Sequence, residues 1–399
     1  MRKRTSVVSL AILTALAGAI VALGGCASMG YYWQGFQGQM GILNAARPID
    51  DWLTDESTSP ALRQRLQAAQ QMRRFASQEL GLPDNASYTH YAQLPRKYAV
   101  WNVVAAPPDS LDMHQWCFPI TGCIAYRGYF AEADAQQEAK EMKAQGLETS
   151  VYGVPAYSTL GYLNWLGGDP LLNTFTGWQE GDFSGLLFHE LAHQLLYVKN
   201  DTAFNESFAT TVERIGTPLW LQTHASEATR QRWQQAQLRR VKWQQLTRGT
   251  RARLQRIYEE KGLNPLDNQS LNAIKLEVFT EFRTQYAQLR AEWLAKDEPL
   301  LTTEALRQQY LERLAQTDDW VAQANNASFG ALAAYDDWVA AMTQWHLQLQ
   351  NGQPPSLEGW QRFYAQMREL AALPKSERTQ QLCAHQPSDI PKPAACKAQ

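Results

Sequence analysis

The chain lacks the features that mark nucleic-acid-binding proteins and multi-span membrane proteins. Its 399 residues carry a formal net charge of only −2, and its arginines alternate with glutamine and glutamate instead of clustering. We therefore expect no nucleic-acid partner, because phosphate recognition needs a concentrated basic surface. After residue 25, no stretch is apolar enough to span a bilayer, which takes roughly 20 consecutive apolar residues. The sequence also shows no internal repeat.

The first 25 residues have the plan of a secretory signal peptide. Basic residues 2–4 precede an apolar run from Val7 to Leu23, which is short for a transmembrane anchor, the alternative interpretation. The ending Leu-Gly-Gly-Cys at 23–26 resembles a bacterial lipobox, in which the cysteine, here Cys26, is lipidated and becomes the first mature residue. This resemblance implies a lipid anchor in the bacterial cell envelope, and Ala27 implies the outer membrane, facing the periplasm. The other 374 residues are then exported, with a charge near −5 once the three leader cations are removed.

Cysteine is scarce, and its spacing disfavours a zinc cluster. Besides Cys26 there are four cysteines, and none of them belongs to a Cys-x-x-Cys pair. An even number of cysteines in an exported chain favours disulfides. Proximity favours Cys117 with Cys123 and Cys383 with Cys396, although four cysteines allow three connectivities.

The pattern of the mature chain predicts an α+β fold that is mostly helical. Residues 98–170 alternate β-branched and aromatic stretches with turns and one helical stretch, which predicts a small mixed sheet. From residue 182 onward, helical patterns dominate. The expected segments are a signal peptide at 1–25, an N-terminal helical tether at 26–97, a catalytic core at 98–216, a helical subdomain at 217–375 and a disulfide-stapled tail at 376–399.

Two helical regions have clear signals. Ser59 can cap a helix that has Pro60 in its first turn, and Gly81 ends it. Apolar residues between 279 and 293 step by three and four, as an antiparallel helical hairpin requires. They are Phe279, Phe282, Tyr286, Leu289 and Trp293.

Two of the seven histidines stand four residues apart in the stretch FHELAH, residues 188–193. Asp182 can cap a helix that runs to about Tyr197, and on it His189 and His193 share one face, so both imidazoles can reach one ion. Glu190 lies about 100° round the helix from His189, where a carboxylate can face a metal-bound water without binding the metal. This is the His-Glu-x-x-His arrangement of zinc peptidases, although two ordinary buried histidines are the alternative interpretation.

A catalytic zinc ion needs a third protein ligand and an open fourth position. Residues 201–216 predict a second helix that Gly216 ends. Its Asn-Glu-x-Phe-Ala stretch, 205–209, resembles the signature of gluzincin peptidases, in which the glutamate, here Glu206, is the third ligand. Only twelve residues separate His193 from Glu206, which requires a tight turn between the helices. Glu213 is the rival candidate for the third ligand. If Glu206 binds the metal, Glu213 or Thr210 is expected to partner a histidine N–H behind the metal, with Asn205 also outside the ligand set.

The stretch 154–216, together with CFPITGCIAYRGYF at 117–130 and NNASFGALAAYDDWV at 325–339, resembles a bacterial family of predicted aminopeptidases, a set of lipoproteins. The resemblance extends over most of the mature chain and is densest from 98 to 216. It implies a small mixed sheet packed on a zincin-type pair of metal-binding helices, followed by a long helical hairpin. It also implies one Zn²⁺ per chain and a peptide substrate.

Further candidates would complete such a site. The stretch 151–163 precedes the metal helix and has strand character, so it could bind a peptide backbone by strand addition, with Tyr157 and Gly161 in the substrate site. A buried hairpin is the alternative. For the oxyanion donor, Tyr335 is the first candidate and Tyr157 the second.

The expected reaction is peptide hydrolysis, in which zinc activates water and Glu190 acts as the general base. The alternative function is a periplasmic scaffold or chaperone-like lipoprotein with a structural zinc site. The presence of Glu190 argues against this alternative, because a structural site needs no such carboxylate. No Gly-x-Met-x-Asn strand, which anchors a free amino terminus in one large aminopeptidase family, is present.

Overall fold

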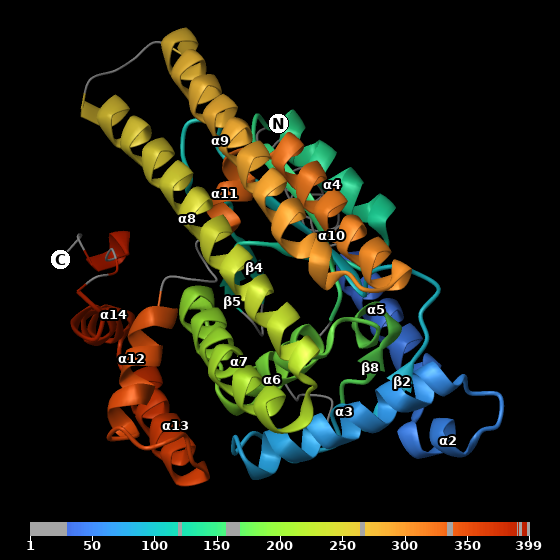
Figure 1. The fold of residues 1–399 in the computed structure, drawn as a ribbon. Coiled ribbons are helices and arrows are strands. Elements are labelled where there is room, and N and C mark those ends of the chain that lie inside the picture. Colours follow the sequence, from blue (N-terminus) through green and yellow to red (C-terminus); the bar gives the residue numbers. More distant parts are fainter. Residues whose placement is uncertain are drawn as a thin grey trace, which may run out of the picture.

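Helices make up most of the structure, a computed structural model that describes residues 30–118, 122–156, 168–263, 268–332, 338–388, 390 and 393–396 (Figure 1). The prediction of a mostly helical α+β fold is confirmed. Within these ranges no helix has both the length and the apolar character that a membrane span requires. Besides a helix over residues 30–45, the helices are α2 (Ile49–Thr54), α3 (Pro60–Gln78), α4 (Glu132–Ala144), α5 (Asn173–Thr176), α6 (Glu180–Leu195), α7 (Thr202–His224), α8 (Glu227–Leu263), α9 (Asn268–Asp297), α10 (Glu304–Gln323), α11 (Asn326–Leu332), α12 (Val339–Leu349), α13 (Leu357–Ala372) and α14 (Lys375–Ala384).

Short strands form three small sheets in the described ranges. An antiparallel sheet has the order β6 (Arg127–Tyr129), β3 (Val100–Ala106), β7 (Glu148–Val154). A mixed sheet has the order β1 (Ala46–Pro48), β2 (His90–Ala92), β8 (Leu171–Leu172), and β4 (Trp116–Phe118) pairs with β5 (Gly122–Ile124). The prediction of one mixed sheet within residues 98–170 was therefore wrong. The strands of the mixed sheet, β1, β2 and β8, all lie outside residues 98–170. The sequence did not predict β1 and β2, because three residues are too few to show a strand pattern.

The central strand β3 is buried on both faces. Its seven residues are all buried. Trp101 and Val103 pack with Ala135 and Ala139 of α4, whereas Val104 and Ala106 pack on the other side against Ala327 of α11. This explains why β3 reads as a continuous apolar run rather than as an alternating one.

The largest core cluster surrounds α6 and α7, which pack closely together with α3 beside them and α12 and α13 along the outer side of α7 (Figure 1). Phe188 of α6 and Phe208 of α7 are fully buried in it. Gly185 permits the close approach of the two helices, because a Cβ atom there would lie 3.2 Å from both Glu213 Cγ and Thr217 Oγ1. A larger residue at 185 would push apart the pair that carries the histidines.

The helix bounds confirm some sequence signals and correct others. Ser59 caps α3 by accepting a hydrogen bond from the N–H of Leu62, as predicted. The predicted end of the second helix at Gly216 was wrong, since α7 continues through Pro218 to His224. Gly216 serves packing instead, because a Cβ there would lie 2.6 Å from Leu80 Cδ1.

Asp182 was also assigned wrongly as the cap of the first helix. Helix α6 begins earlier, at Glu180, after Gln179. The carboxylate of Asp182 forms an ion pair with Arg313 of α10.

Helices α8 and α9 form the predicted antiparallel hairpin, which extends from the rest of the protein (Figure 1). Phe279, Phe282, Tyr286 and Trp293 of α9 are buried in a second core cluster with Leu246 and Leu254 of α8. The stepping of these aromatic residues is therefore explained by core packing, as expected.

Candidate metal site

His189 and His193 lie one turn apart on α6 and face Glu206 on α7. Their Nε2 atoms are 3.1 Å apart. Glu206 Oε2 lies 3.4 Å from Nε2 of His189 and 3.6 Å from Nε2 of His193. Donor atoms held tetrahedrally at about 2.0–2.1 Å from a zinc ion are separated by about 3.3–3.4 Å. The three side chains therefore could hold one metal ion.

The charges around His189 favour a cation at this point. Burial by itself lowers the pKa of His189, but its hydrogen bonds with Glu206 and Glu213, together with nearby carboxylate charge, outweigh burial and raise the pKa well above its usual value. Burial raises the pKa of Glu206, whereas the charges and hydrogen bonds of His193 and His189 lower it more, so the net pKa is below its usual value. A site that keeps its carboxylate ionised and attracts a proton also suits a divalent cation, which competes with that proton.

A short turn returns the chain from His193 to Glu206. Asn205 closes this turn, since its Oδ1 accepts a hydrogen bond from the N–H of Val198 at 2.7 Å and its Nδ2 donates to the Val198 carbonyl at 2.8 Å. The side chain of Asn205 thus binds backbone next to Glu206, whereas the sequence placed it behind the metal ligands. This double hydrogen bond explains how so few residues suffice between the two helices.

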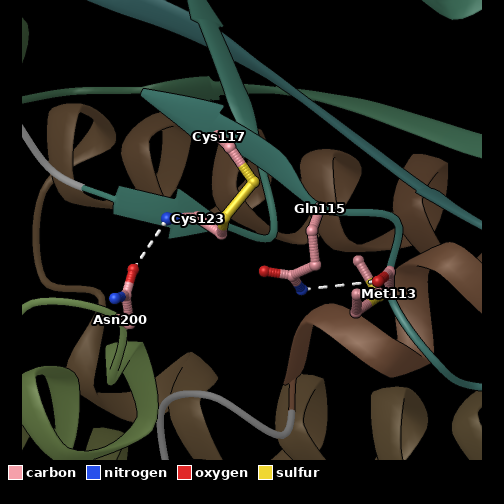
Figure 2. The surroundings of a disulfide bond; sticks show 5 residues. All are labelled: Met113, Gln115, Cys117, Cys123 and Asn200. Carbon is pink, nitrogen blue, oxygen red and sulfur yellow. Dashed lines mark hydrogen bonds between the residues drawn. A yellow bond between two sulfur atoms is a disulfide. The ribbon is translucent and has the colours of Figure 1, made fainter. Parts of the chain in front are cut away.

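The hairpin of β4 and β5 braces the same turn (Figure 2). A disulfide joins Cys117 to Cys123, and the N–H of Cys123 donates to Asn200 Oδ1 at 2.9 Å. Asn200 has a φ of 64°, a left-handed conformation that asparagine tolerates better than most residues. The next residue, Asp201, caps α7 by accepting a hydrogen bond from the N–H of Phe204. The disulfide hairpin therefore supports the segment that positions Glu206.

Glu213 lies behind His189 and not among the three donors. Its Oε2 is 3.3 Å from Nδ1 of His189, and its Oε1 is 3.2 Å from a guanidinium nitrogen of Arg240 on α8. Burial raises the pKa of Glu213, but the hydrogen bond with His189 and the charge of Arg240 lower it more, to about 2. An ionised carboxylate on the far nitrogen fixes the ring orientation of a metal-binding histidine. Glu213 therefore contacts Nδ1 of His189, whereas Glu206 contacts Nε2 of the same ring.

Glu190 lies on the cavity wall beside the donors but does not join them. Burial raises the pKa of its carboxyl group, the charges of His189 and His193 oppose this, and the charge of Glu206 adds to it, with a net increase. A carboxylate with a raised pKa is better suited to accept and return a proton near neutral pH.

A single cavity of about 1380 Å³ contains this group of side chains. It is larger than the roughly 300–1,000 Å³ of pockets for small molecules, so it has room for a peptide. Its walls come from the helix over residues 30–45, the antiparallel sheet, α6, α7, α8 and α10. Lining residues from these walls include Tyr32, Phe36, Asn102, Tyr126, Val154, His189, Glu190, His193, Tyr197, Glu206, Thr210, Trp233, Arg248 and Glu312.

Two tyrosines on this wall were missed by the sequence analysis. The pKa of Tyr126 is raised well above its usual value, first by burial and then by the charges of Glu206 and Glu190, which shows how near the phenol lies to the site. Tyr197 also contributes to this shift and lines the cavity. Tyr197 lies two residues beyond the end of α6, so the periodicity of that helix does not indicate its position. Nothing local in the sequence indicated Tyr126.

The structure leaves several sequence-based candidates undecided. Thr210, a candidate partner of a histidine N–H, lines the cavity. Nδ1 of His193 is buried and has no hydrogen-bond partner among the described residues. Tyr157, Gly161, Tyr335 and Cys26 lie outside the described residues.

Comparison with known proteins gives one family. The sequence model of the family described as "Putative aminopeptidase" matches residues 30–382, which include the whole donor group and most of the cavity wall. No curated protein and no solved structure matches the chain significantly. The chain belongs to the putative aminopeptidase family.

Proposed function

We propose that the protein is a zinc-dependent aminopeptidase of the bacterial cell envelope. The observation that carries this proposal is the juxtaposition of three candidate metal donors at tetrahedral separations with a half-buried carboxylate, Glu190, outside the donor set. Membership of the putative aminopeptidase family supports a peptide substrate. The leader that resembles a lipobox supports the location.

His189, His193 and Glu206 would hold the ion. A bound zinc ion would supply a Lewis acid that polarises the scissile carbonyl and acidifies water. Glu213 would keep the ring of His189 in the orientation that directs Nε2 toward the other donors. Asn205 and the disulfide hairpin would hold Glu206 in register with the histidines.

The proton transfers of hydrolysis fall to Glu190. Its carboxylate accepts a proton from water as the water oxygen bonds to the carbonyl carbon. It then returns the proton to the amide nitrogen as the carbon–nitrogen bond breaks, which yields a carboxylate and an amine. The raised pKa of Glu190 supports both transfers, because it brings the acid and base forms closer in energy near neutral pH.

A tyrosine hydroxyl is the expected donor to the oxyanion. Tyr126 and Tyr197 are candidates in addition to Tyr335, since both line the cavity. The charges of Glu206 and Tyr197 both affect the pKa of the Tyr126 phenol.

A substrate backbone could add to the edge of β7 that pairs with no other strand in the described ranges, because Val154 and Ala156 line the cavity at the end of that strand. In the sequence, Tyr157, the residue predicted to contact substrate, comes three residues after Val154.

The alternative function is a scaffold with a structural metal. A structural zinc site is closed by four protein ligands, whereas a catalytic site keeps one position open. The described residues supply three donors, and these face a cavity of peptide size. Both observations favour catalysis.

Metal analysis combined with peptide cleavage tests the proposed function. We expect one zinc ion per chain in the purified protein, cleavage of a peptide library at free amino termini, and loss of cleavage after chelation with recovery on adding zinc. Glu206→Ala should lose the ion, whereas Glu213→Ala should retain it. Full zinc occupancy in Glu206→Ala with loss in Glu213→Ala would mean that the third ligand is Glu213.

A further inference from the structure

The helix over residues 30–45 has one side that is fixed to the protein. Its Tyr31 ring lies 5.5 Å from the rings of both Phe118 in β4 and Tyr129 in β6, measured between centroids. The guanidinium of Arg127 lies 4.2 Å above the same tyrosine ring. Further along the helix, Ile42 is buried in the main core. These contacts fix the rotation of the helix and therefore decide which side chains face solvent.

The outer side of this helix presents three aromatic rings to solvent. The exposed fractions are 49% for Tyr32, 58% for Trp33 and 56% for Phe36. The rings of Trp33 and Phe36 stack on each other with centroids 5.7 Å apart. We call these three residues the aromatic face. The other large exposed hydrophobic residues in the described ranges are aliphatic, such as Leu238 and Leu276. Among the described residues, exposed aromatic rings therefore occur only on the helix over residues 30–45.

Such a concentration needs an explanation. The chain has 43 phenylalanine, tryptophan and tyrosine residues in total, and those that the structure describes are otherwise buried or half-buried. Single exposed apolar residues are ordinary, but a contiguous exposed group usually marks an interaction site.

The position of the aromatic face in the chain indicates what covers it. Cys26 precedes the first described helical residue, Gly30, by four residues, and an extended chain spans at most ~3.6 Å per residue, so roughly 14 Å separates them at most. The apolar run from Val7 to Leu23 ends just before Cys26. Whether a lipid on Cys26 or this apolar run holds the protein, the attachment to the membrane lies next to this helix. The aromatic face occupies its first two turns, the part nearest the attachment.

We propose that the aromatic face, Tyr32, Trp33 and Phe36, docks on the lipid bilayer at the level of the headgroups. Tryptophan and tyrosine favour this interface because they combine a large apolar ring with a polar group. One lipid chain alone gives marginal and reversible membrane binding, and a second contact makes the anchoring stable. The docked helix would fix the orientation of the protein, which a flexible tether alone cannot do.

Docking would also bring the part of the cavity wall that Tyr32 and Phe36 form to the membrane surface. Tyr32 and Phe36 line the cavity that contains His189 and Glu206. A protein held by the aromatic face therefore receives its ligands close to the bilayer surface. The docking itself does not depend on the proposed peptidase activity.

Site-directed spin labelling of the full chain in vesicles tests this proposal. The lipoprotein is reconstituted in vesicles of phosphatidylethanolamine and phosphatidylglycerol, with a label on Trp33→Cys or, as the control, on Leu276→Cys. Leu276 is 64% exposed and lies on the distant α9 helix. We expect the label at 33 to collide with oxygen, which dissolves in the bilayer, several-fold more often relative to a water-soluble nickel chelate than the label at 276. Equal access of the nickel chelate to both labels would overturn the proposal.

Two further measurements distinguish other occupants of the aromatic face. If the label at 33 is shielded in the absence of vesicles, the face is covered by residues 7–23 or by a second copy, and the proposal fails. In addition, a chain that lacks residues 1–26, and so carries neither the lipid nor the apolar run, should sediment with these vesicles more than the same chain with Trp33→Ala and Phe36→Ala, and equal sedimentation would contradict docking. Neither readout uses enzymatic activity, so failure here and failure of the proposed function are separable.

Discussion

Glu213 contacts the His189 ring at Nδ1, whereas Glu206 contacts it at Nε2. Its carboxylate accepts from Nδ1 of His189 on one side and meets Arg240 on the other, so it orients the ring and is itself held in place. A carboxylate in this position also makes the opposite ring nitrogen a better donor.

Removing the charge of Glu213 should weaken metal binding without abolishing it. Glu213→Gln keeps the size of the side chain, and we expect zinc affinity to fall by about 10- to 100-fold, the usual effect of losing such a partner. Competition with a chromophoric chelator measures this affinity. Glu312→Gln makes the same chemical change on the same cavity wall and should have no effect. Equal affinities in the Glu213 and Glu312 variants would contradict the orienting role.

The individual residues of the donor group were readable from the sequence because their spacing reflects helix geometry. His189 and His193 are one turn apart on any helix, whatever surrounds it. Tyr126 and Arg240 could not be found in this way, since their places depend on how the antiparallel sheet and α8 pack against α6 and α7. Contacts between distant elements leave no local pattern in the chain.

At the scale of elements, α12 contains a buried histidine that the proposed reaction does not use. His346 is fully buried, with its ring 4.4 Å from Trp360 and 5.3 Å from Phe363, both on α13. Burial lowers the pKa of this imidazole to about 4. In the unfolded chain the pKa is about 6.5, so only the unfolded form takes up the proton between these two values.

This shift predicts a loss of stability in acid. The contribution of the neutral histidine is fully present above pH of about 6.5 and is lost as the pH falls through about 4, by roughly 3–4 kcal/mol in total. His346→Gln cannot take up a proton, so its free energy of unfolding should decrease less than that of the wild type between pH 7 and 4.5. Urea denaturation at both pH values measures the difference. Parallel pH dependence of the two proteins would refute this account.

The start of a helix was predictable where a cap and apolar periodicity agree, as for α3, and the buried side of α9 was predictable from periodicity alone. The predicted start of α6 and the predicted end of α7 were wrong, because the residues that usually mark a helix boundary make tertiary contacts there. Gly216 gives room to Leu80, and Asp182 pairs with Arg313. Such residues satisfy tertiary packing, which a local rule cannot take into account.

At the scale of the whole molecule, a buried ion pair joins the C-terminal region to the start of α7. Arg378 of α14 is buried and donates to Asp201 Oδ2 from Nε at 3.0 Å and from a terminal guanidinium nitrogen at 2.7 Å. Asp201 in turn caps α7, the helix that carries Glu206. A second disulfide, Cys383–Cys396, joins α14 to the segment beyond it.

Breaking this buried ion pair should destabilise the fold strongly. Arg378→Met leaves the Asp201 carboxylate buried without its cation, which typically costs about 3–5 kcal/mol. Arg362→Met on α13 removes an exposed pair with Glu358 and should cost less than about 1 kcal/mol. Chemical denaturation of both variants measures these changes. Similar stability losses in the two variants would show that the link from α14 to α7 is unimportant.

The central claim is that the metal site performs hydrolysis, and Glu190→Gln tests it most directly. Because Glu190 lies outside the donor set, the variant should fold normally and contain as much zinc as the wild type. It should lose about 10²–10⁴-fold in kcat, the usual contribution of a general base, with little change in KM. Wild-type kcat in a Glu190→Gln protein that contains its full complement of zinc would contradict the account.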